Sequence, residues 1–333
     1  MPRPANLESP ASLRRFRRNL LTWYRHHQRP LPWRKTGDPY RIWVSEIMLQ
    51  QTRVTAVLEH YKRFLKRFPT VRHLAKADEA EVLAVWSGLG YYRRARMLHR
   101  AAQLVVVDRA GCIPESAGEL RMLPGIGRYT SNAIASIAFG EAVAVVDGNV
   151  QRVLARLLGE DVSGERCWNM AQMLLDATSP GDFNQAIMEL GATICVPGVP
   201  LCPGCPVSRQ CASRGAQRET TSIPEARLRR SSSVLLIRRG AAILLRQRGH
   251  DERLMPGMWE LPEAHGEISR EPLLRVKHSI TTSDWSVSVF AGDERQLGTR
   301  KRWVPLGRVS RLPLTGLTRK ILQKLKLLSW NPM

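Results

Sequence analysis

Four cysteines within a window of 17 residues constrain this chain more than any other feature. Cys195, Cys202, Cys205 and Cys211 follow the spacing C-x6-C-x2-C-x5-C, and the 333 residues contain only two other cysteines, Cys112 and Cys167. Crowded thiols in a long chain without a secretory signal predict a four-thiolate metal site in a reducing compartment rather than disulfides. The spacing matches neither a zinc ribbon nor the ferredoxin runs, so it leaves zinc and iron–sulfur open. We expect Cys112 and Cys167 to be buried as small hydrophobic residues.

The net charge indicates what kind of partner the chain meets. Lys and Arg number 51 against 29 Asp and Glu, which gives a net charge of +22 and a pI of about 10.8. Such an excess attracts a polyanion, and nucleic acid is favoured over an anionic membrane surface or a merely solvated face. No apolar run approaches the ~20 residues of a membrane-spanning helix. The Arg-rich start has no apolar segment and contains Glu8, so we expect a bacterial, cytoplasmic protein acting on the chromosome.

The hydrophobic pattern divides the chain into two domains of different class. Residues 1–212 show helical periodicity separated by Gly- and Pro-bearing turns, over the segments 40–51, 55–67, 79–86, 92–107, 130–139, 149–158, 166–176 and 183–194. A polar, basic stretch at 213–230 is typical of a linker. Residues 231–333 predict an α+β domain, with two strands joined at Gly240, a strand at 285–290 and a helix at 315–328. The fold class expected is therefore α followed by α+β.

A turn with two glycines joins two of the helical patterns. In Leu123-Pro124-Gly125-Ile126-Gly127-Arg128-Tyr129, glycines let the backbone come close to a ligand, and the following helix offers free N–H groups. These donors suit a phosphate and read no base. The alternative is a plain interhelical turn, which the high positive charge makes less favoured.

Two carboxylates occupy unusual positions. Glu46 lies inside the apolar stretch Ile42-Trp43-Val44-Ser45-Glu46-Ile47-Met48-Leu49, where burial would raise its pKa and keep it protonated. Asp147 follows an apolar run and is placed to cap the next helix, which would keep it ionised. One neutral acid and one ionised partner can cleave a glycosidic bond through an oxocarbenium-like transition state. From physical arguments alone, a salt-bridged Glu46 and a purely structural Asp147 are equally favoured.

Five sequence stretches resemble the adenine DNA glycosylase (MutY) family. They are SEIMLQQTRV, GLGYYRRA, LPGIGRYT, VVDGNVQRVLAR and NQAIMELGATIC, followed by the four-cysteine spacing, in order from about residue 14 to 211. The resemblance implies a helix-hairpin-helix domain with a [4Fe–4S] cluster on the loop 195–211, which selects iron–sulfur over zinc. It also implies removal of adenine mispaired with 8-oxoguanine or guanine in double-stranded DNA. A monomer is the default expectation for the oligomeric state.

The resemblance assigns roles to individual residues. The family's acid, which protonates adenine N7, falls on Glu46, and its oxocarbenium-stabilising carboxylate on Asp147, with Asn149 beside it. A tyrosine that assists the transition state falls on Tyr129. Endonuclease III-like glycosylases have a lysine there whose amine attacks the sugar. Because tyrosine forms no imine, we expect base release without strand cleavage.

Further positions match DNA-contacting segments of the family. Because adenine has to leave the duplex, residues are needed to hold the opened stack and to line the adenine pocket. The residues that hold the opened base stack are, by this resemblance, Gln50, Gln51, Thr52 and Tyr91. Those that line the adenine pocket are Arg34 and Glu189. Helix packing is the alternative for Glu189. Arg209 and Arg214 are candidates for phosphate contacts near the cluster loop.

The C-terminal domain resembles the Nudix-like module with which the family reads 8-oxoguanine. Gly257-Met258-Trp259-Glu260-Leu261-Pro262 is the best match, and no carboxylate run for Mg-dependent pyrophosphate hydrolysis follows it. The family's His-x-Phe-Ser-His loop corresponds to His278-Ser279-Ile280-Thr281-Thr282, so Thr281 keeps a hydroxyl while the aromatic ring and the second histidine are missing. We expect Thr281 to contact the lesion and discrimination against guanine to be weaker or carried by other residues. A thymine- or uracil-mismatch glycosylase and a non-catalytic DNA-binding protein are the alternative functions.

Overall fold

The backbone forms two compact units, each made of two segments of the chain. The computed structural model describes residues 7, 9–214, 227–249, 251–252, 254–264, 266, 268–280, 283–293 and 301–328. The first unit combines residues 1–51 with 104–222, and the second combines 52–103 with 223–333. The chain thus leaves the first unit after Gln51 and returns to it at Leu104. The boundaries 1–212, 213–230 and 231–333 stay a prediction, although the first strand already begins at Leu228.

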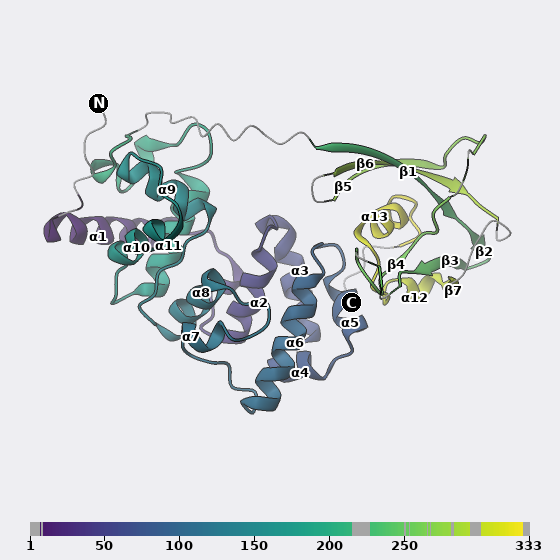
Figure 1. The fold of residues 1–333 in the computed structure, drawn as a ribbon, viewed down its shortest axis with the longest axis horizontal. Coiled ribbons are helices and arrows are strands. Elements are labelled where there is room, and N and C mark those ends of the chain that lie inside the picture. Colours follow the sequence, from purple (N-terminus) through teal and green to yellow (C-terminus); the bar gives the residue numbers. More distant parts are fainter. Residues whose placement is uncertain are drawn as a thin grey trace. The chain divides into compact units, whose positions relative to one another are not determined.

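Helices build the first unit (Figure 1). Its elements are α1 (Pro10–His27), η1 (Pro32–Arg34), α2 (Pro39–Leu49), α7 (Ala117–Leu120), α8 (Arg128–Phe139), α9 (Gly148–Leu158), α10 (Gly164–Leu174), α11 (Pro180–Thr193), η2 (Cys202–Gly204) and η3 (Ser208–Gln210). Helix α1 was not predicted from the sequence. Ser9 caps it, with its Oγ accepting from the Ser12 N–H at 3.2 Å, and Pro10 occupies the first turn. Its buried Phe16 and Leu20 join Phe183 and Leu190 of α11 in one core, so the Arg-rich N-terminal stretch is a packed helix.

The second unit begins with helices and ends with sheets. Its helices are α3 (Val54–Arg67), α4 (Val71–Lys76), α5 (Glu79–Trp86), α6 (Arg93–Asp108, which continues into the first unit), α12 (Leu306–Val309) and α13 (Gly316–Lys324). Its strands are β1 (Leu228–Leu236), β2 (Arg238–Arg239), β3 (Ala242–Gln247), β4 (Trp259–Glu260), β5 (Leu274–Ile280), β6 (Ser283–Ala291) and β7 (Lys301–Pro305). An α part followed by an α+β part confirms the fold class expected from the sequence.

Two sheets form the α+β part. In one, β1 pairs parallel with β6, and β6 pairs antiparallel with β5. In the other, β3 lies between β7 and the short strands β2 and β4, all antiparallel to it. Gly240, with φ of +55°, turns β2 into β3 as predicted, but the long strand before it, β1, belongs to the other sheet. Ile243, Leu245 and Val287 pack with Ile321 and Leu322 of α13 in one core.

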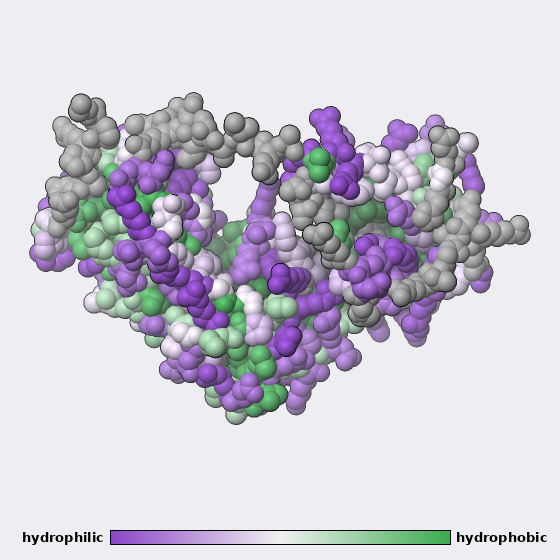
Figure 2. All heavy atoms as spheres, in the orientation of Figure 1, coloured by the Kyte–Doolittle hydropathy of each residue, from purple (hydrophilic) through white to green (hydrophobic). Residues whose placement is uncertain are grey.

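Polar residues cover much of the described surface. Hydrophilic side chains predominate on the face shown in Figure 2, with hydrophobic patches between them. Among the described residues, no helix has the length and hydrophobicity needed to cross a membrane.

Candidate active site

Glu46 is a buried carboxyl within α2. Asp38 caps this helix by accepting from the Tyr40 N–H at 2.9 Å, and Pro39 fits the first turn. Eight of its residues are buried, and Glu46 among them is only 6% exposed. Burial raises the pKa of Glu46 to about 7, helped by the negative charge of Asp147 and opposed by a hydrogen bond from Tyr129. Near neutral pH, Glu46 therefore exists in both protonation states, as a general acid requires.

Tyr129 links α8 to both α2 and α11. Its hydroxyl donates to Glu46 Oε2 at 2.9 Å and lies 3.2 Å from Met188 Sδ. Burial, together with the charges of Glu46 and Asp147, raises its pKa well above the usual 10.0. The phenol therefore keeps its proton and serves as a hydrogen-bond donor at physiological pH. Tyr129 is the second residue of α8, directly after the glycine turn.

Asp147 is the N-cap of α9. Its Oδ1 accepts from the Val150 N–H at 2.7 Å, and its Oδ2 accepts from Asn149 Nδ2 at 3.0 Å. The carboxylate also faces the positive end of the helix dipole, which is a favourable position for a negative charge. A fixed negative charge therefore lies close enough to Glu46 to influence its pKa.

Asn184 of α11 holds the extended segment that leads to Asp147. Its Nδ2 donates to Val143 O at 2.8 Å and to Ser136 Oγ at 2.9 Å, and its Oδ1 accepts from Val145 N at 3.2 Å. The side chain is 1% exposed, so these bonds are shielded from water. The sequence analysis did not identify this positioning role. The only signal was that Asn184 opens the stretch NQAIMELGATIC.

A close approach of α11 to α9 positions Asn149. A side chain at Gly191 would lie 2.8 Å from Asn149 Cβ, so only glycine fits there. Arg152 bridges the two helices by donating to Asn149 Oδ1 at 2.8 Å and to Gly191 O at 2.7 Å. Asn149 therefore contacts Asp147 through its amide nitrogen and Arg152 through its oxygen.

The structure brings Arg34 and Glu189 into direct contact. Glu189 is fully buried and accepts from Arg34 Nη2 at 2.8 Å. Arg29, which the sequence analysis did not identify, donates to both oxygens of Glu189, at 2.8 and 2.6 Å. Burial alone would raise the pKa of Glu189, but the hydrogen bonds from Arg29 and Arg34 lower it to about 2. Glu189 is thus an ionised partner of two arginines.

Two candidate DNA-contacting residues have left-handed backbone conformations. Gln51, exposed after the end of α2, has a φ of +53°, and Tyr91, 48% exposed, has a φ of +47°. Non-glycine residues rarely adopt this conformation outside functional sites and turns. In the first unit, Gln50 donates to Thr130 Oγ1 at 3.1 Å. In the second, Thr52 Oγ1 accepts from Arg94 at 3.0 Å, and the Arg94 guanidinium lies 5.4 Å from the Tyr91 ring centre.

The glycine turn has the expected backbone. Gly125 has a φ of +79°, which favours glycine, whereas a side chain at Gly127 would meet no atom within 4 Å. Gly127 is the N-cap of α8, and no side chain caps the helix from this position. Its first N–H groups are therefore oriented outward at an exposed turn, as an anion site requires.

The four cysteines line one small cavity. Its volume is about 30 Å³, and its other lining residues are Arg156, Ile194, Pro200, Ser208, Ser213 and Arg214. Arg156 is 7% exposed and donates to Val196 O at 2.7 Å and to Cys195 Sγ at 3.5 Å. Among the described residues, no three His, Cys, Asp or Glu side chains are arranged to hold a single metal ion. Four thiols around a common cavity, with a buried cation beside them, fit a multi-iron cluster.

The remaining cysteines and arginines differ in exposure. Cys167 is buried as expected, but Cys112 is exposed, so that part of the expectation was wrong. The reason is local: Ala110 and Gly111, both with positive φ, follow α6 and turn the chain outward at Cys112. Arg209 and Arg214 are exposed next to the cysteine loop, and Arg214 donates to Arg209 O at 3.0 Å.

The second unit contains a larger cavity of about 580 Å³. Its lining residues include Tyr91, Arg96, Met255 and Pro256, together with His278 and Ser279 of β5. Arg96 fixes the wall by donating to Pro256 O at 2.6 Å. Thr281 and Thr282, and the side chain of Ile280, lie outside the described residues. His278 and Ser279 were placed in the recognition loop from the sequence, but the lesion contact was expected from Thr281, and their part in lining a cavity was not predicted.

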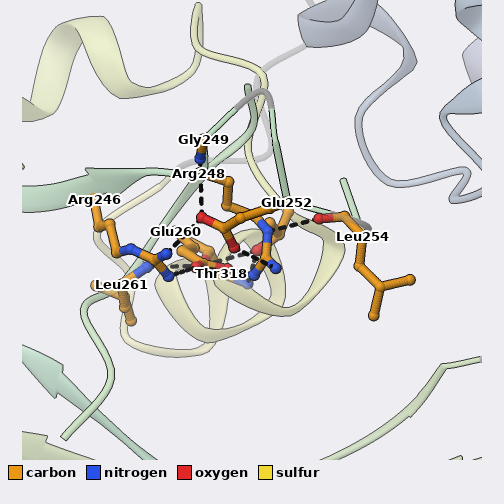
Figure 3. Close-up of polar contacts among 9 residues, drawn as sticks. Arg246, Arg248, Gly249, Glu252, Leu254, Glu260, Leu261 and Thr318 are labelled. Atoms are coloured by element: carbon orange, nitrogen blue, oxygen red, sulfur yellow. Dashed lines mark hydrogen bonds and ion pairs between the residues drawn. The ribbon is translucent and has the colours of Figure 1, made fainter. Parts of the chain in front are cut away.

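Two arginines and two glutamates support this wall (Figure 3). Arg246 pairs with Glu252 and Glu260, at 2.5 and 2.7 Å, and Arg248 pairs with the same two carboxylates at 2.7 and 2.9 Å. Arg248 also donates to Leu254 O at 2.7 Å, next to the wall residues. Because both carboxylates are neutralised by arginines, this arrangement does not offer the free carboxylates that bind Mg²⁺ in pyrophosphate hydrolysis.

Comparison with known proteins agrees with this geometry. A family model described as HhH-GPD superfamily base excision DNA repair protein matches residues 44–166. A solved structure of a thermostable thymine-DNA glycosylase is 30% identical, with a TM-score of 0.58, and the alignment covers 61% of this chain and 97% of that one. The chain belongs to the HhH-GPD superfamily of base excision DNA repair proteins.

Within that superfamily, two curated relatives are both named adenine DNA glycosylase. The adenine DNA glycosylase of Rattus norvegicus is 47% identical over 231 residues, and that of Homo sapiens is 48% identical over 219 residues. These alignments cover 64% and 61% of this chain but 45% and 40% of the relatives. The chain therefore matches less than half the length of these two proteins.

Proposed function

We propose that this protein is a monofunctional DNA glycosylase that hydrolyses the N-glycosidic bond of adenine mispaired with 8-oxoguanine or guanine. The observation that supports it most is the hydrogen-bonded pair of Glu46 and Tyr129 beside the helix-capping Asp147. The name shared by these two curated relatives supports adenine as the base.

Each residue has a role that follows from its protonation state. Adenine is first turned out of the duplex, because a stacked base is inaccessible to a buried acid. Protonated Glu46, with its pKa of about 7, gives its proton to the departing base, so the bond breaks without forming an adenine anion. Ionised Asp147 stabilises the positive charge that develops on the sugar, and water then completes the hydrolysis.

The same geometry supports base release without strand cleavage. A lyase step requires an amine that forms an imine with the sugar. Tyr129 supplies a phenol whose raised pKa keeps it protonated, and its hydroxyl is engaged with Glu46. The product would therefore be an abasic site in an intact strand.

We further propose a [4Fe–4S] cluster on Cys195, Cys202, Cys205 and Cys211, with a structural role. When bound, the cluster would cross-link the loop and hold the exposed Arg209 and Arg214 near DNA phosphates. The common cavity and the adjacent Arg156 support this assignment.

Reading of the base opposite adenine is assigned to the second unit. The cavity lined by Tyr91, His278 and Ser279 is large enough for a base, and Thr281 follows in the same loop. Burial and the charge of Lys320 lower the pKa of His278, so its ring is neutral and can both donate and accept hydrogen bonds.

The experiment is single-turnover cleavage of duplexes with one adenine opposite 8-oxoguanine, guanine, cytosine or thymine, together with a thymine–guanine duplex. Breaks would be scored with and without alkali. Alkali-dependent breaks at adenine, fastest opposite 8-oxoguanine, are expected. Breaks at thymine instead would favour the activity named for the thermostable thymine-DNA glycosylase, and alkali-independent breaks would contradict the monofunctional mechanism.

A further inference from the structure

A second cavity in the second unit is lined mainly by nitrogen-bearing side chains. Its volume is about 350 Å³, and its lining residues come from α3, the turn after α5, β5 and α13: His60, Arg63, Ser87, Gly88, His278, Gly316, Arg319, Lys320 and Gln323. None of these described lining residues is an aspartate or a glutamate. Three of the lining residues are the cations Arg63, Arg319 and Lys320, and the excision chemistry proposed above uses none of them.

Two of the cations are held in place without a carboxylate. Arg319 Nε donates to Ser87 Oγ at 2.9 Å, and that hydroxyl donates to Leu314 O at 2.8 Å. Lys320 Nζ donates to Lys277 O at 2.7 Å. Among the described residues, neither Arg319 nor Lys320 forms an ion pair with an acidic side chain. Their charges are therefore positioned by neutral oxygens, and in the described part of the chain no carboxylate is paired with them.

The cations of this cavity repel one another. Burial lowers the pKa of Arg319, and the positive charge of Arg63 lowers it further. Burial likewise lowers the pKa of Arg63, which the charge of Glu59 only partly offsets. His60 has a pKa lowered by burial and by the charge of Arg63, so its ring adds no positive charge, and its two nitrogens lie 2.9 Å from Ala56 O and 3.3 Å from Ser87 O. Like charges brought together in a partly desolvated space are stabilised when an anion enters between them.

We propose that this cavity binds an oxyanion of the phosphate class. The guanidinium groups of Arg63 and Arg319 suit phosphate oxygens because their N–H groups form a planar fork, and Lys320 adds a point charge. Its volume of about 350 Å³ also accommodates the sugar to which a phosphate is attached. The phosphate can come from a DNA backbone or from a free phosphate compound, and both sources share this chemistry.

Two glycines are shared by the two cavities of the second unit. Gly88 and Gly316, together with His278, line both this cavity and the one of about 580 Å³. A side chain at Gly88 would lie 3.1 Å from His60 Nε2, and one at Gly316 would lie 3.7 Å from the His278 ring. The cationic cavity therefore adjoins the cavity assigned above to a DNA base, which is where a backbone phosphate would be found. The anion site itself does not depend on that assignment.

The test uses the full-length protein and two pairs of variants. Arg63→Gln and Lys320→Gln each remove one charge from the cavity. Lys62→Gln, next to Arg63 on α3, and Lys324→Gln, one turn from Lys320 on α13, remove one exposed charge outside it. Lys320→Arg keeps the charge and serves as rescue. Circular dichroism would establish that each variant is folded.

The two sources of phosphate are separated by two measurements. The first is the rise in Tm caused by inorganic phosphate relative to chloride at equal ionic strength. The second is the slope of log K for duplex binding against log salt, whose magnitude falls by about 0.9 for each DNA phosphate that the protein no longer neutralises. If the cavity binds a free phosphate compound, only the rise in Tm caused by phosphate becomes smaller in Arg63→Gln and Lys320→Gln. If it binds a DNA phosphate, the magnitude of the salt slope also falls in these two variants, and Lys320→Arg restores it.

The inference is overturned if both cavity variants match their controls in both measurements. A fall in the Tm response of all four glutamine variants alike would also overturn it, since that would indicate general charge screening rather than a site. Because no cleavage is measured, failure of the proposed glycosylase activity and failure of the anion site are distinguishable results.

Discussion

The two units hold their candidate functional groups by different means. In the first unit, Glu46 lies inside a helix, Asp147 caps one, and Tyr129 lies in the first turn of one, and hydrogen bonds to neighbouring groups fix all three. In the second, the candidate recognition residues lie around a cavity of about 580 Å³, supported by partly exposed ion pairs. A chemical step requires its reacting groups to be fixed to a fraction of an ångström, whereas recognition of a base tolerates small movements of the residues that line the cavity.

Replacing the buried acid tests the first unit most severely. Glu46→Gln keeps the shape of the side chain but removes its proton donor. We expect the single-turnover rate of adenine release to fall roughly 10²–10⁴-fold, with duplex affinity unchanged. Glu115→Gln, on an exposed loop, is the control. Full activity in Glu46→Gln would show that the fixed arrangement of the first unit is structural only.

Asn184 tests whether rigidity matters for the chemistry. Asn184→Ala leaves the buried Val145 N–H and the Val143 carbonyl without this partner, which should lower the free energy of unfolding by about 2–3 kcal/mol and slow adenine release. Gln172→Ala is the control, because the exposed Gln172 bonds the same segment, at Ala144 N and Ala142 O, where water can replace it. If urea titrations showed equal decreases in the free energy of unfolding for Asn184→Ala and Gln172→Ala, the role of burial would be contradicted.

The pH profile tests the link between Tyr129 and Glu46. Since the acid form of Glu46 is required, the rate should fall as pH rises through about 7. The hydrogen bond from Tyr129 lowers the pKa of Glu46, so Tyr129→Phe should move this fall to higher pH as well as reduce the rate. Single-turnover rates between about pH 5 and pH 9 measure it. An unmoved profile would mean that the hydrogen bond does not tune the acid.

Stability should depend on the same carboxyl. The pKa of Glu46 is about 7 in the folded protein and near its ordinary value of 4.5 in the unfolded chain. The folded state therefore binds the proton more tightly, and the contribution of Glu46 to stability falls as pH rises between these two values. The unfolding free energy of the parent relative to that of Glu46→Gln should therefore be lower at about pH 8 than at about pH 5.

The smallest effect is expected in the ion-pair network of the second unit. Glu252→Gln weakens its pairs with Arg246 and Arg248 and should cost about 1 kcal/mol of stability, since these groups are partly exposed. The ratio of rates opposite 8-oxoguanine and guanine should shift while the rate of the chemical step stays the same. Glu263→Gln, exposed nearby in sequence, is the control. A large drop in rate would contradict the separation of chemistry from recognition.

Much of the fold was available from local patterns. The helical segments and the α+β character of the C-terminal part follow from hydrophobic periodicity, which depends on neighbouring residues. The Arg-rich helix α1 was missed because charge obscured an apolar face whose partner, Phe183, is far away in the sequence. The partner of β1 was not predicted either, because it pairs with β6, whose residues lie 55 positions further along the chain (Leu228 opposite Ser283).

By itself, the sequence determined the superfamily, the two domain classes and the positions of Glu46, the capping Asp147 and the four cysteines. Only the tertiary structure decided what surrounds them. Arg29 meets Glu189 across 160 residues, and Asn184 reaches Val145 across 39. The cationic cavity likewise combines residues from α3 and α13. Burial and charge are set by these long-range contacts, and so the pKa of Glu46 and the character of each cavity arise only when the chain is folded.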